Sequence, residues 1–336
     1  MPLTTIVHKI SPDNPDEAII TEAADILRSG GLVAFPTETV YGLGADALNE
    51  AAVLGIFAAK GRPADNPLIV HIADAAQLED FSPDVTESAV LLTKHFWPGA
   101  LTIILKAKQH IPKIVTGGLD TIALRMPDHK VPIALLRELR GGMVGPSANL
   151  SGKPSPTTAQ HVYADLNGKI GMILDAGPTR IGVESTVIDV TQPTPVILRF
   201  GGIPKEEIEK IIGAVQTTAD RQQKKRSPGT RYRHYAPKAK VILVPRGNAF
   251  VFGKLLEQQR AIPRKIGCIL HSIDPRGVKN SAEMRMFTFP ESEYASRIFD
   301  TLRQLDDLGV SVIYVEMVPE TGIGVAVMDR LRRAAE

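Results

Sequence analysis

The sequence of 336 residues contains a single cysteine, Cys268. One thiol excludes an internal disulfide framework, and it also excludes a zinc site built from several cysteines. We expect a reducing, cytoplasmic location, which suits a chain with so few thiols. Met1 to Ile10 lacks the apolar core of a secretory signal, and no apolar run approaches the length of a membrane span. We therefore expect no membrane association.

Several motifs of common enzyme classes are also missing. Gly152-Lys153 is followed by Pro154, so the usual phosphate loop G-x-x-x-x-G-K-[ST] does not occur. The segment from Gly145 to Asn149 departs from a nucleophile elbow at its last position, where Asn replaces Gly. The eight histidines include no H-E-x-x-H pair. These absences argue against a P-loop enzyme, an elbow-type hydrolase and a zinc protease, and the metal ligands stay unknown.

What is present is an ordinary globular composition, with 43% hydrophobic and 23% charged residues and a net charge of +2. The length suits two domains. We predict a catalytic domain over residues 1–215, a basic linker over 216–240 and a smaller domain over 241–336. The linker has no apolar periodicity, and its only acid is Asp220.

The first domain is predicted to be α/β. We expect helices over Pro15–Ser29, from the N-cap Asn49 to a stop at Pro63, and over Val85–Phe96, Pro132–Leu139, Thr158–Leu166 and Pro204–Val215. Strands are expected over Leu32–Phe35, Leu68–Ile72, Leu101–Lys106, Thr121–Arg125, Met143–Val144, Met172–Leu174, Ser185–Val190 and Val196–Phe200. Because several connections are too short for crossover helices, the sheet should be twisted and mixed.

The last domain shows a more regular alternation. Strands are predicted over Val241–Val244, Lys265–Leu270 and Val310–Val315, and helices over Asn248–Arg260, over Glu291–Leu308 and at the end of the chain. This order predicts a Rossmann-like α/β domain. Gly322-Ile323-Gly324 lacks a third glycine and does not directly follow a strand, so it predicts no dinucleotide site.

Lys60 and Arg62 stand at a helix end, just before a buried strand. Two cations on a loop stiffened by Pro63 and Pro67 suit an anionic ligand such as a polyphosphate, and replacing either should leave the fold intact. The alternative is that they only complement the helix dipole.

Two further loops carry hydroxyls, amides and glycines. Thr37 to Gly44 and Gly145 to Ser155 let a ligand approach the backbone closely, although each is also compatible with an ordinary polar turn. Arg125 should leave the end of a buried strand, directed either at a ligand or at a structural carboxylate.

Taken together, these motifs resemble the YrdC-type domain of threonylcarbamoyl-AMP synthases. The resemblance covers Pro36–Gly44, Phe57–His71 and Pro146–Asn149, and it extends to Ser227–Pro237, which is similar to the linker of the two-domain members. It implies a nucleotidyltransferase that converts ATP, L-threonine and bicarbonate into threonylcarbamoyl-AMP and pyrophosphate for tRNA modification. Mg²⁺ is expected with ATP, and tRNA or the downstream transfer machinery is a further expected partner.

The resemblance also implies residue roles. Lys60 and Arg62 would be catalytic and hold phosphates, and the nucleotide site would further include Asn66, Thr121, Ser147, Asn149, Ser155, Arg199 and Tyr235. Threonine would be surrounded by Thr39, His71, Arg125, Gly145 and Ser185. Few acids around the site would favour the neutral amine that the reaction needs.

Two other functions remain open at this point. A basic linker would also suit an RNA-binding module without catalysis, although the chain as a whole is not strongly basic. A different carbamoyl transfer is disfavoured, because proteins of that kind carry cysteine-rich zinc modules. The segment Ser227–Pro237 is either a lid over the nucleotide, anchored by Tyr232 and Tyr235, or a solvated tether.

Overall fold

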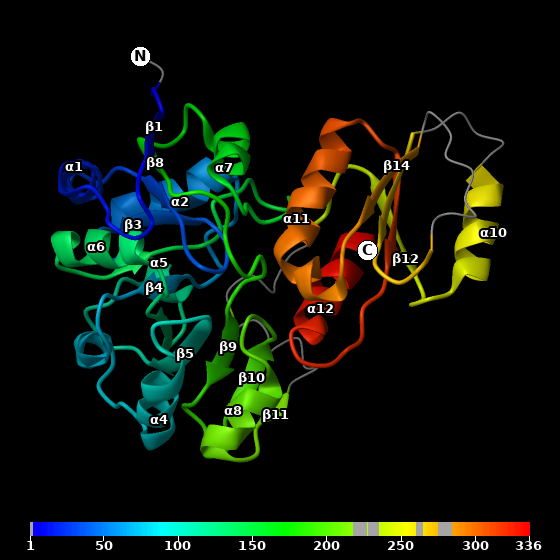
Figure 1. Ribbon diagram of the computed structural model, residues 1–336. Helices are drawn as coiled ribbons and strands as arrows, with labels where there is room; N and C mark the ends of the chain where they lie inside the picture. Colours follow the sequence, from blue (N-terminus) through cyan, green and yellow to red (C-terminus); the bar gives the residue numbers. More distant parts are fainter. Residues whose placement is uncertain (1–2, 218–226, 228–234, 260–264, 275–283) are drawn as a thin grey trace. The chain divides into compact units, whose positions relative to one another are not determined.

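The computed structural model describes residues 3–217, 227, 235–259, 265–274 and 284–336 (Figure 1). The chain divides into two compact units, one of Met1–Ser151 with Ser155–Tyr232 and the other of Gly152–Pro154 with Arg233–Glu336. Both units are α/β, which confirms the predicted fold class. Most of the predicted linker, including Tyr232 and most of the proposed lid, lies outside the described residues. No described helix is long and apolar enough to span a bilayer.

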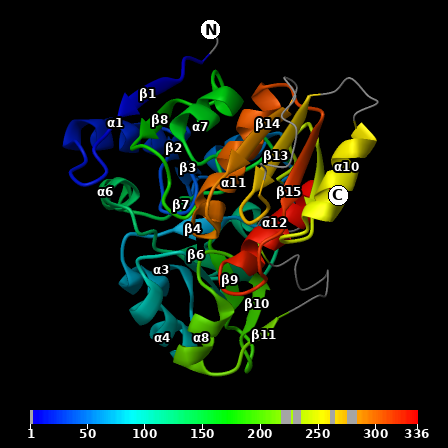
Figure 2. The same ribbon diagram turned by 45° about the vertical axis from the view of Figure 1, so that its right-hand side comes forward.

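The first unit is built on one long mixed sheet with the strand order β1-β8-β2-β3-β7-β4-β6-β5-β9-β10-β11 (Figures 1 and 2). Its strands are β1 (Ile6–Lys9), β2 (Val33–Phe35), β3 (Gly42–Asp46), β4 (Ile69–His71), β5 (Leu101–Lys106), β6 (Thr121–Arg125), β7 (Met143–Val144), β8 (Met172–Asp175), β9 (Thr186–Asp189), β10 (Val196–Arg199) and β11 (Gln216–Thr217). The sheet contains both parallel pairs, such as β4–β6, and antiparallel pairs, such as β5–β6. The prediction of a mixed sheet is confirmed.

Helices of the first unit pack on this sheet. They are α1 (Glu17–Arg28), α2 (Glu50–Lys60), α3 (Leu78–Phe81), α4 (Glu87–Phe96), α5 (Lys113–Thr116), α6 (Lys130–Leu139), α7 (Ala159–Leu166) and α8 (Lys205–Ile212), with a short 3₁₀ helix, η1 (Ala75–Gln77). α1 starts at Asp16, whose carboxylate accepts from the N–H groups of Ala18 and Ile19. Its buried face, which includes Leu27, packs with α6 in one apolar cluster.

Three local predictions for this unit are wrong. The prediction had α2 end at Pro63, but it ends at Lys60 because Gly61 takes a left-handed conformation (φ 59°) that caps the helix. The expected loop at Thr37–Gly44 is partly the strand β3, in which a Cβ on Gly42 would come within 2.6 Å of the Phe35 ring. The linker was predicted to begin at Gln216, which instead pairs with β10 as part of β11.

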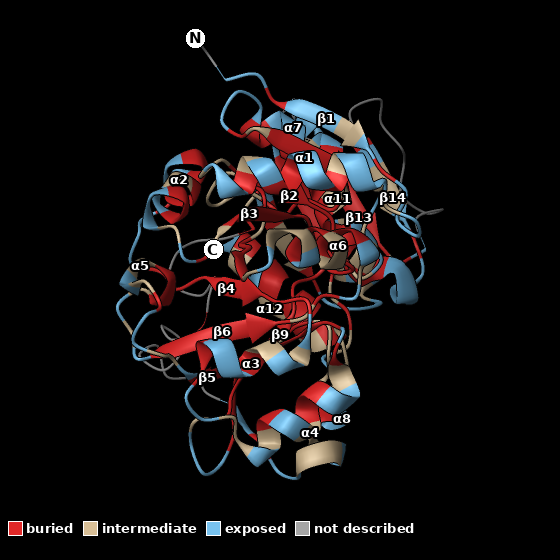
Figure 3. Cartoon of the chain, turned by 90° about the vertical axis from the view of Figure 1, so that its left-hand side faces the viewer, coloured by how far each residue is buried: buried red, intermediate tan, exposed pale blue. Residues whose placement is uncertain are grey.

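The centre of the sheet brings the ends of three strands together. β4 and β6 run parallel, with His71 opposite Arg125 in the register. β7 runs antiparallel to β4, and the N–H of Gly145 donates to the carbonyl of Ile69 (2.9 Å). In Figure 3, β4 and β6 are buried along their whole length. The sheet therefore holds His71, Arg125 and Gly145 as neighbours on a rigid support.

The second unit is a four-stranded parallel sheet, in agreement with the predicted Rossmann-like domain. Its order is β12 (Lys240–Val244), β15 (Val312–Glu316), β13 (Ile266–Leu270) and β14 (Met284–Thr288). Its helices are α10 (Ala249–Gln259), α11 (Glu291–Asp307) and α12 (Gly324–Ala335). The edge strand β14 was not predicted from the sequence, since only its first residue is buried.

Glu316 ties together the carboxyl ends of the strands in this unit. Its side chain is fully buried and accepts from the backbone N–H groups of Gly247, His271, Ser272 and Ile273 at 2.9 to 3.1 Å. Burial raises the pKa of this carboxyl, but the backbone and Ser272 hydrogen bonds outweigh it and bring the pKa down to about 2. The sheet edge where a Rossmann-like domain would bind an anion is thus occupied by the chain's own carboxylate.

Glu316→Gln should therefore loosen the second unit. A carboxyl whose pKa falls from 4.5 to about 2 on folding stabilises the folded state above pH 4.5, by about 3 kcal/mol, and this contribution disappears as the pH falls towards 2. We expect labelling of Cys268, which is buried in β13, to become much faster in the variant at pH 7. Fluorescence of the single Trp97, in the first unit, should report unchanged unfolding there.

The exposed acid Glu293 offers the control, because Glu293→Gln removes a charge that pairs with the exposed Arg297. Equal Cys268 labelling rates for Glu316→Gln and Glu293→Gln would show that the buried carboxylate does not stabilise the unit.

Candidate functional site

Lys60 closes a contact between the end of α2 and the loop after β7. Only 3% of its surface is exposed, and its ammonium donates to the carbonyl of Ser147, to the carbonyl of Asn149 (2.7 Å) and to the Asn149 amide oxygen (3.4 Å). The N–H of Ser151 donates in turn to the Lys60 carbonyl (2.9 Å). The structure thus brings three predicted nucleotide-site residues together. It also corrects the expectation that Lys60 can be removed without affecting the fold, because its ammonium satisfies buried carbonyl groups.

Arg62 and Asn66 lie on the turn that follows α2. The Arg62 guanidinium lies over the Phe57 ring, 5.8 Å from its centroid, and donates to the carbonyl of Pro67 at 3.4 Å. Asn66 is fully buried, and neither atom of its amide has a hydrogen-bond partner among the described residues. A buried amide of this kind is costly unless a ligand satisfies it. Asn66 is therefore a strong candidate for a ligand contact.

His71 and Gly145 form the next part of the site. The His71 ring is buried and makes a T-shaped contact with the Phe35 ring, and a Cβ on Gly145 would lie 2.6 Å from the Nδ1 atom of His71. Only glycine allows the backbone to approach the ring so closely. Burial, with a smaller contribution from Arg125, lowers the pKa of His71 to about 3, so the ring is neutral at pH 7. Its Nδ1 has no hydrogen-bond partner among the described residues.

Arg125 pairs with a carboxylate that the sequence analysis did not assign to the site. Its Nη2 lies 2.8 Å from Oε2 of Glu38, and its Nε donates to the carbonyl of Gly99 (3.1 Å). Both side chains are nearly fully buried. The prediction that few acids surround the threonine site is therefore wrong at this position. The one available signal was the isolated acid among hydroxyl residues in Thr37–Gly44.

The backbone of the loop that carries Glu38 is hydrogen-bonded to the segment at Ile181 and Gly182. The carbonyls of Glu38 and Thr39 accept from the N–H groups of Ile181 (2.8 Å) and Gly182 (3.0 Å). The hydroxyl of Thr39 is 2.8 Å from that of Thr37. Thr39, predicted to contact threonine, thus sits directly beside the ion pair.

Ser185 and Arg199 form the opposite part of the site. Arg199 donates through Nε and Nη2 to the carbonyl of Ser185 (3.1 and 2.9 Å), and the Ser185 hydroxyl is 2.7 Å from that of Thr102. The neighbouring Glu184 accepts from the hydroxyl of Ser155 (2.6 Å). These three predicted residues, Ser155, Ser185 and Arg199, are therefore joined through β9 and β10.

One short segment links this part to Arg125. Gly99 accepts from Arg125, and its neighbour Ala100 accepts from the N–H of Thr186 (3.0 Å). Thr121, by contrast, starts the strand that Arg125 ends, so the two lie about 13 Å apart along β6. Thr121 is buried, and its predicted contact with the nucleotide stays a prediction.

Tyr235 belongs to the second unit. It has a left-handed backbone (φ 68°), its ring stacks on Phe299 at a centroid distance of 5.4 Å, and the Arg330 guanidinium lies 5.3 Å from the ring centroid. The predicted role of Tyr235 in the nucleotide site is not decided by this packing and stays a prediction.

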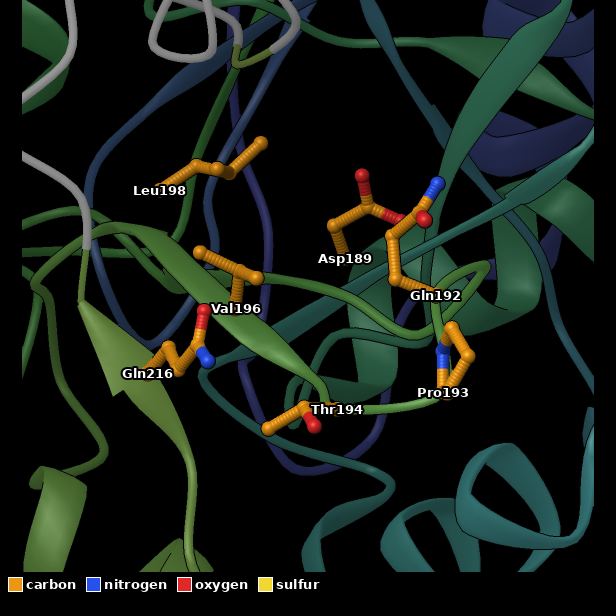
Figure 4. Close-up of a pocket in the computed structure, with 7 residues that line it drawn as sticks. All are labelled: Asp189, Gln192, Pro193, Thr194, Val196, Leu198 and Gln216. Carbon is orange, nitrogen blue, oxygen red and sulfur yellow. The ribbon is translucent and has the colours of Figure 1, made fainter.

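Two cavities of the first unit differ in their relation to these residues: one borders Glu38, and the other includes none of them. One of about 390 Å³ has Thr37 and Glu38 among the residues that line it. The other, of about 480 Å³, is formed around Asp189, Val196, Leu198 and Gln216 (Figure 4) and includes none of the predicted site residues. Within the described part of the chain, no group of three His, Cys, Asp or Glu residues is arranged to hold a metal ion.

Comparison with known proteins agrees with this architecture. Residues 25–201 match the Sua5/YciO/YrdC family model, described as telomere recombination, and residues 203–336 match the model of the threonylcarbamoyl-AMP synthase C-terminal domain. The chain is 48% identical to the threonylcarbamoyl-AMP synthase of Pyrococcus abyssi, over 95% of each chain. It is 46% identical to that of Bacillus subtilis, over 98% of this chain and 96% of the relative.

Solved structures give the same result. The crystal structure of P. abyssi Sua5 complexed with L-threonine superposes with a TM-score of 0.92 and 46% identity, covering 98% of both chains. E. coli YciO is 29% identical with a TM-score of 0.55 and covers 59% of this chain and 96% of its own. The chain therefore belongs to the threonylcarbamoyl-AMP synthase family.

Proposed function

We propose that this chain makes threonylcarbamoyl-AMP from ATP, L-threonine and bicarbonate. The threonine ammonium and bicarbonate form a carbamate: the nitrogen bonds to the bicarbonate carbon, a C–O bond of bicarbonate breaks to release water, and one proton is lost. A carbamate oxygen then attacks the α-phosphorus of ATP, and pyrophosphate leaves. No side-chain nucleophile is needed, so the protein has to align the reactants and balance the developing charge.

The observation that carries this proposal is a set of buried polar groups with unused hydrogen-bonding capacity. Hydrogen-bond partners among the described residues are lacking for the Asn66 amide and for Nδ1 of His71. They are also lacking for both carboxylate oxygens of Glu38 and for Nη2 of Arg125. Such groups are expected where a polar ligand completes the site. Their buried position argues against the RNA-binding alternative, which would use exposed cations.

The nucleotide is proposed to bind where α2 meets the loop after β7. Arg62 and Asn66 would contact the phosphates, while Lys60 would act from its place on the carbonyls of Ser147 and Asn149. Ser155 and Arg199, with Thr121 and Tyr235 as further predicted contacts, would complete the nucleotide site.

Mg²⁺ is proposed to arrive bound to ATP. Magnesium usually keeps several waters and binds substrate phosphates with few protein ligands. The lack of an acidic cluster among the described residues is compatible with a metal held mainly by the triphosphate.

Threonine is proposed to bind at the opposite end of the same network. Arg125 would receive its carboxylate, and Thr39, the neutral His71, Gly145 and Ser185 would surround the rest of the molecule. The product would pass to the machinery that modifies tRNA, and we propose a cytoplasmic location.

Asn66→Ala tests the nucleotide site without weakening the fold. Because the Asn66 amide has no hydrogen-bond partner among the described residues, its removal should leave the free energy of unfolding unchanged or higher, while ATP use falls. Trp97 fluorescence during denaturation and ATP–pyrophosphate exchange would measure the two effects.

Asn49→Ala is the matched control, since the Asn49 side chain caps α2 by accepting from the N–H of Ala52. It should cost about 1 kcal/mol of stability and leave ATP use intact. A loss of stability in Asn66→Ala without any loss of ATP use would assign Asn66 a purely structural role.

Arg62→Ala should abolish adenylate formation with the fold retained. Loss of a charged phosphate contact should cost on the order of 2–4 kcal/mol of transition-state stabilisation. Lys60→Ala should lose activity and stability together, because its carbonyl acceptors would lose their donor. Exposed Arg137→Ala is the control for charge removal, and near-normal turnover of Arg62→Ala would contradict the phosphate role.

Arg125→Lys should raise the KM for threonine far more than the KM for ATP. Lysine carries one nitrogen, which cannot contact Glu38, the Gly99 carbonyl and a substrate carboxylate in the geometry of a guanidinium. Steady-state kinetics with each substrate varied in turn provide the measurement. An equal rise in both KM values would place Arg125 in a structural or nucleotide-facing role.

A further inference from the structure

The Glu38–Arg125 pair has an unusual hydrogen-bonding state for a buried ion pair. The two charges are 2.8 Å apart, yet the contact is not aligned as a hydrogen bond. Neither oxygen of Glu38 and neither hydrogen of Arg125 Nη2 has a hydrogen-bond partner among the described residues. Buried ion pairs are stable only when their remaining donors and acceptors are satisfied. The pair is thus prepared for a bound group that both donates and accepts.

An α-amino acid presents such a group, because its ammonium and carboxylate are attached to one carbon. A carboxylate beside a guanidinium matches this arrangement: Arg125 faces the substrate carboxylate and Glu38 faces the ammonium. This arrangement requires that the loop with Glu38 keep its position. The backbone carbonyls of Glu38 and Thr39 hold it there by accepting hydrogen bonds from the N–H groups at residues 181 and 182.

The reaction also requires a proton to leave at this position. Threonine enters as an ammonium, and carbamate formation follows the balance R–NH₃⁺ + HCO₃⁻ → R–NH–COO⁻ + H₂O + H⁺. The new bond joins nitrogen to carbon, and the proton comes from the nitrogen. His71 is a poor acceptor because burial lowers its pKa to about 3.

A cavity also borders the Glu38 residue. The cavity of about 390 Å³ has Thr37 and Glu38 in its wall, and the side chains of Asp13 and Arg180 on it are 88% and 67% exposed. The cavity is open to solvent at Asp13 and Arg180, whereas both carboxylate oxygens of Glu38 are covered by the protein. Besides Arg125, the charged or titratable groups that face Glu38 across the cavity are Asp13, Asp128, His129, Lys130 and Arg180.

We propose that Glu38 is a catalytic residue that binds the substrate ammonium, accepts its proton as the carbamate forms and holds that proton until the product leaves the site. This inference rests on the proposed function. It assigns Glu38 to carbamate formation and not to the later attack on ATP.

The two directions of the reaction separate this role from a structural one. Synthesis from threonine, bicarbonate and ATP needs the proton transfer, whereas pyrophosphorolysis of threonylcarbamoyl-AMP to ATP and the carbamate does not. In Glu38→Gln, synthesis should fall about 100-fold, the usual scale for loss of a general base, while ATP formation from threonylcarbamoyl-AMP and pyrophosphate stays within about threefold. Synthesis by the variant should also recover by about tenfold per pH unit as threonine loses its ammonium proton.

Glu184→Gln provides the control, because it also converts a buried carboxylate to an amide but on the Ser155 side of the site. Any loss there should be equal in both directions. If thermal unfolding shows that Glu38→Gln is not folded, Glu38→Asp is the variant to test. It keeps the charge opposite Arg125 but withdraws the carboxylate by one methylene. It should show the same loss of synthesis without a matching loss of pyrophosphorolysis.

Equal losses in both directions, or no loss in synthesis, would overturn the role of Glu38. Failure of the unsubstituted protein to catalyse either direction would instead overturn the proposed function.

Discussion

The buried ion pair between Glu38 and Arg125 is the interaction on which the first unit's site depends. Two charges removed from water are costly, and they remain charged only if their surroundings hold them close together. The pair joins the loop after β2 to the end of β6. Through the Gly99 carbonyl, the same guanidinium reaches the segment that supports Ser185. Deleting the Arg125 guanidinium would leave the Glu38 carboxylate buried without its partner charge.

Backbone groups satisfy two other buried charges of this protein, those of Lys60 and Glu316. The ammonium of Lys60 is held by carbonyls of the loop after β7, and the carboxylate of Glu316 is held by N–H groups at the end of the parallel sheet. The first arrangement places a cation beside a loop proposed to bind phosphates. The second fills the sheet edge that would otherwise attract an anion. Pairing of a buried charge with backbone groups therefore supports the proposed phosphate site in the first unit. In the second unit the same kind of pairing fills the position where an anion would bind.

Prediction from the sequence succeeded where a pattern is local. The bounds of β5, β6 and β7 agree with the prediction, because each strand is built on a short apolar run. Prediction from the sequence failed where pairing with residues distant in the chain determines the secondary structure. β3 contains glycines that only make sense against Phe35 and Met143, and β11 forms because β10 lies beside it. The end of α2 shows a third cause, since a left-handed Gly61 stops the helix before the proline can.

For the site, the sequence by itself determined which chemical groups are available: the cations Lys60, Arg62, Arg125 and Arg199, and the hydroxyl and glycine loops around them. The resemblance of these motifs to those of a known family also identified the reaction. The order of motifs along the chain can be recognised without knowing any distance between them. Only the tertiary structure decided that Lys60 is buried on carbonyls, that Asn66 lacks an internal partner among the described residues, and that Glu38 faces Arg125. The physical reason is that charge pairing, burial and unused hydrogen-bonding capacity depend on distances between residues far apart in the chain, and no local pattern encodes those distances.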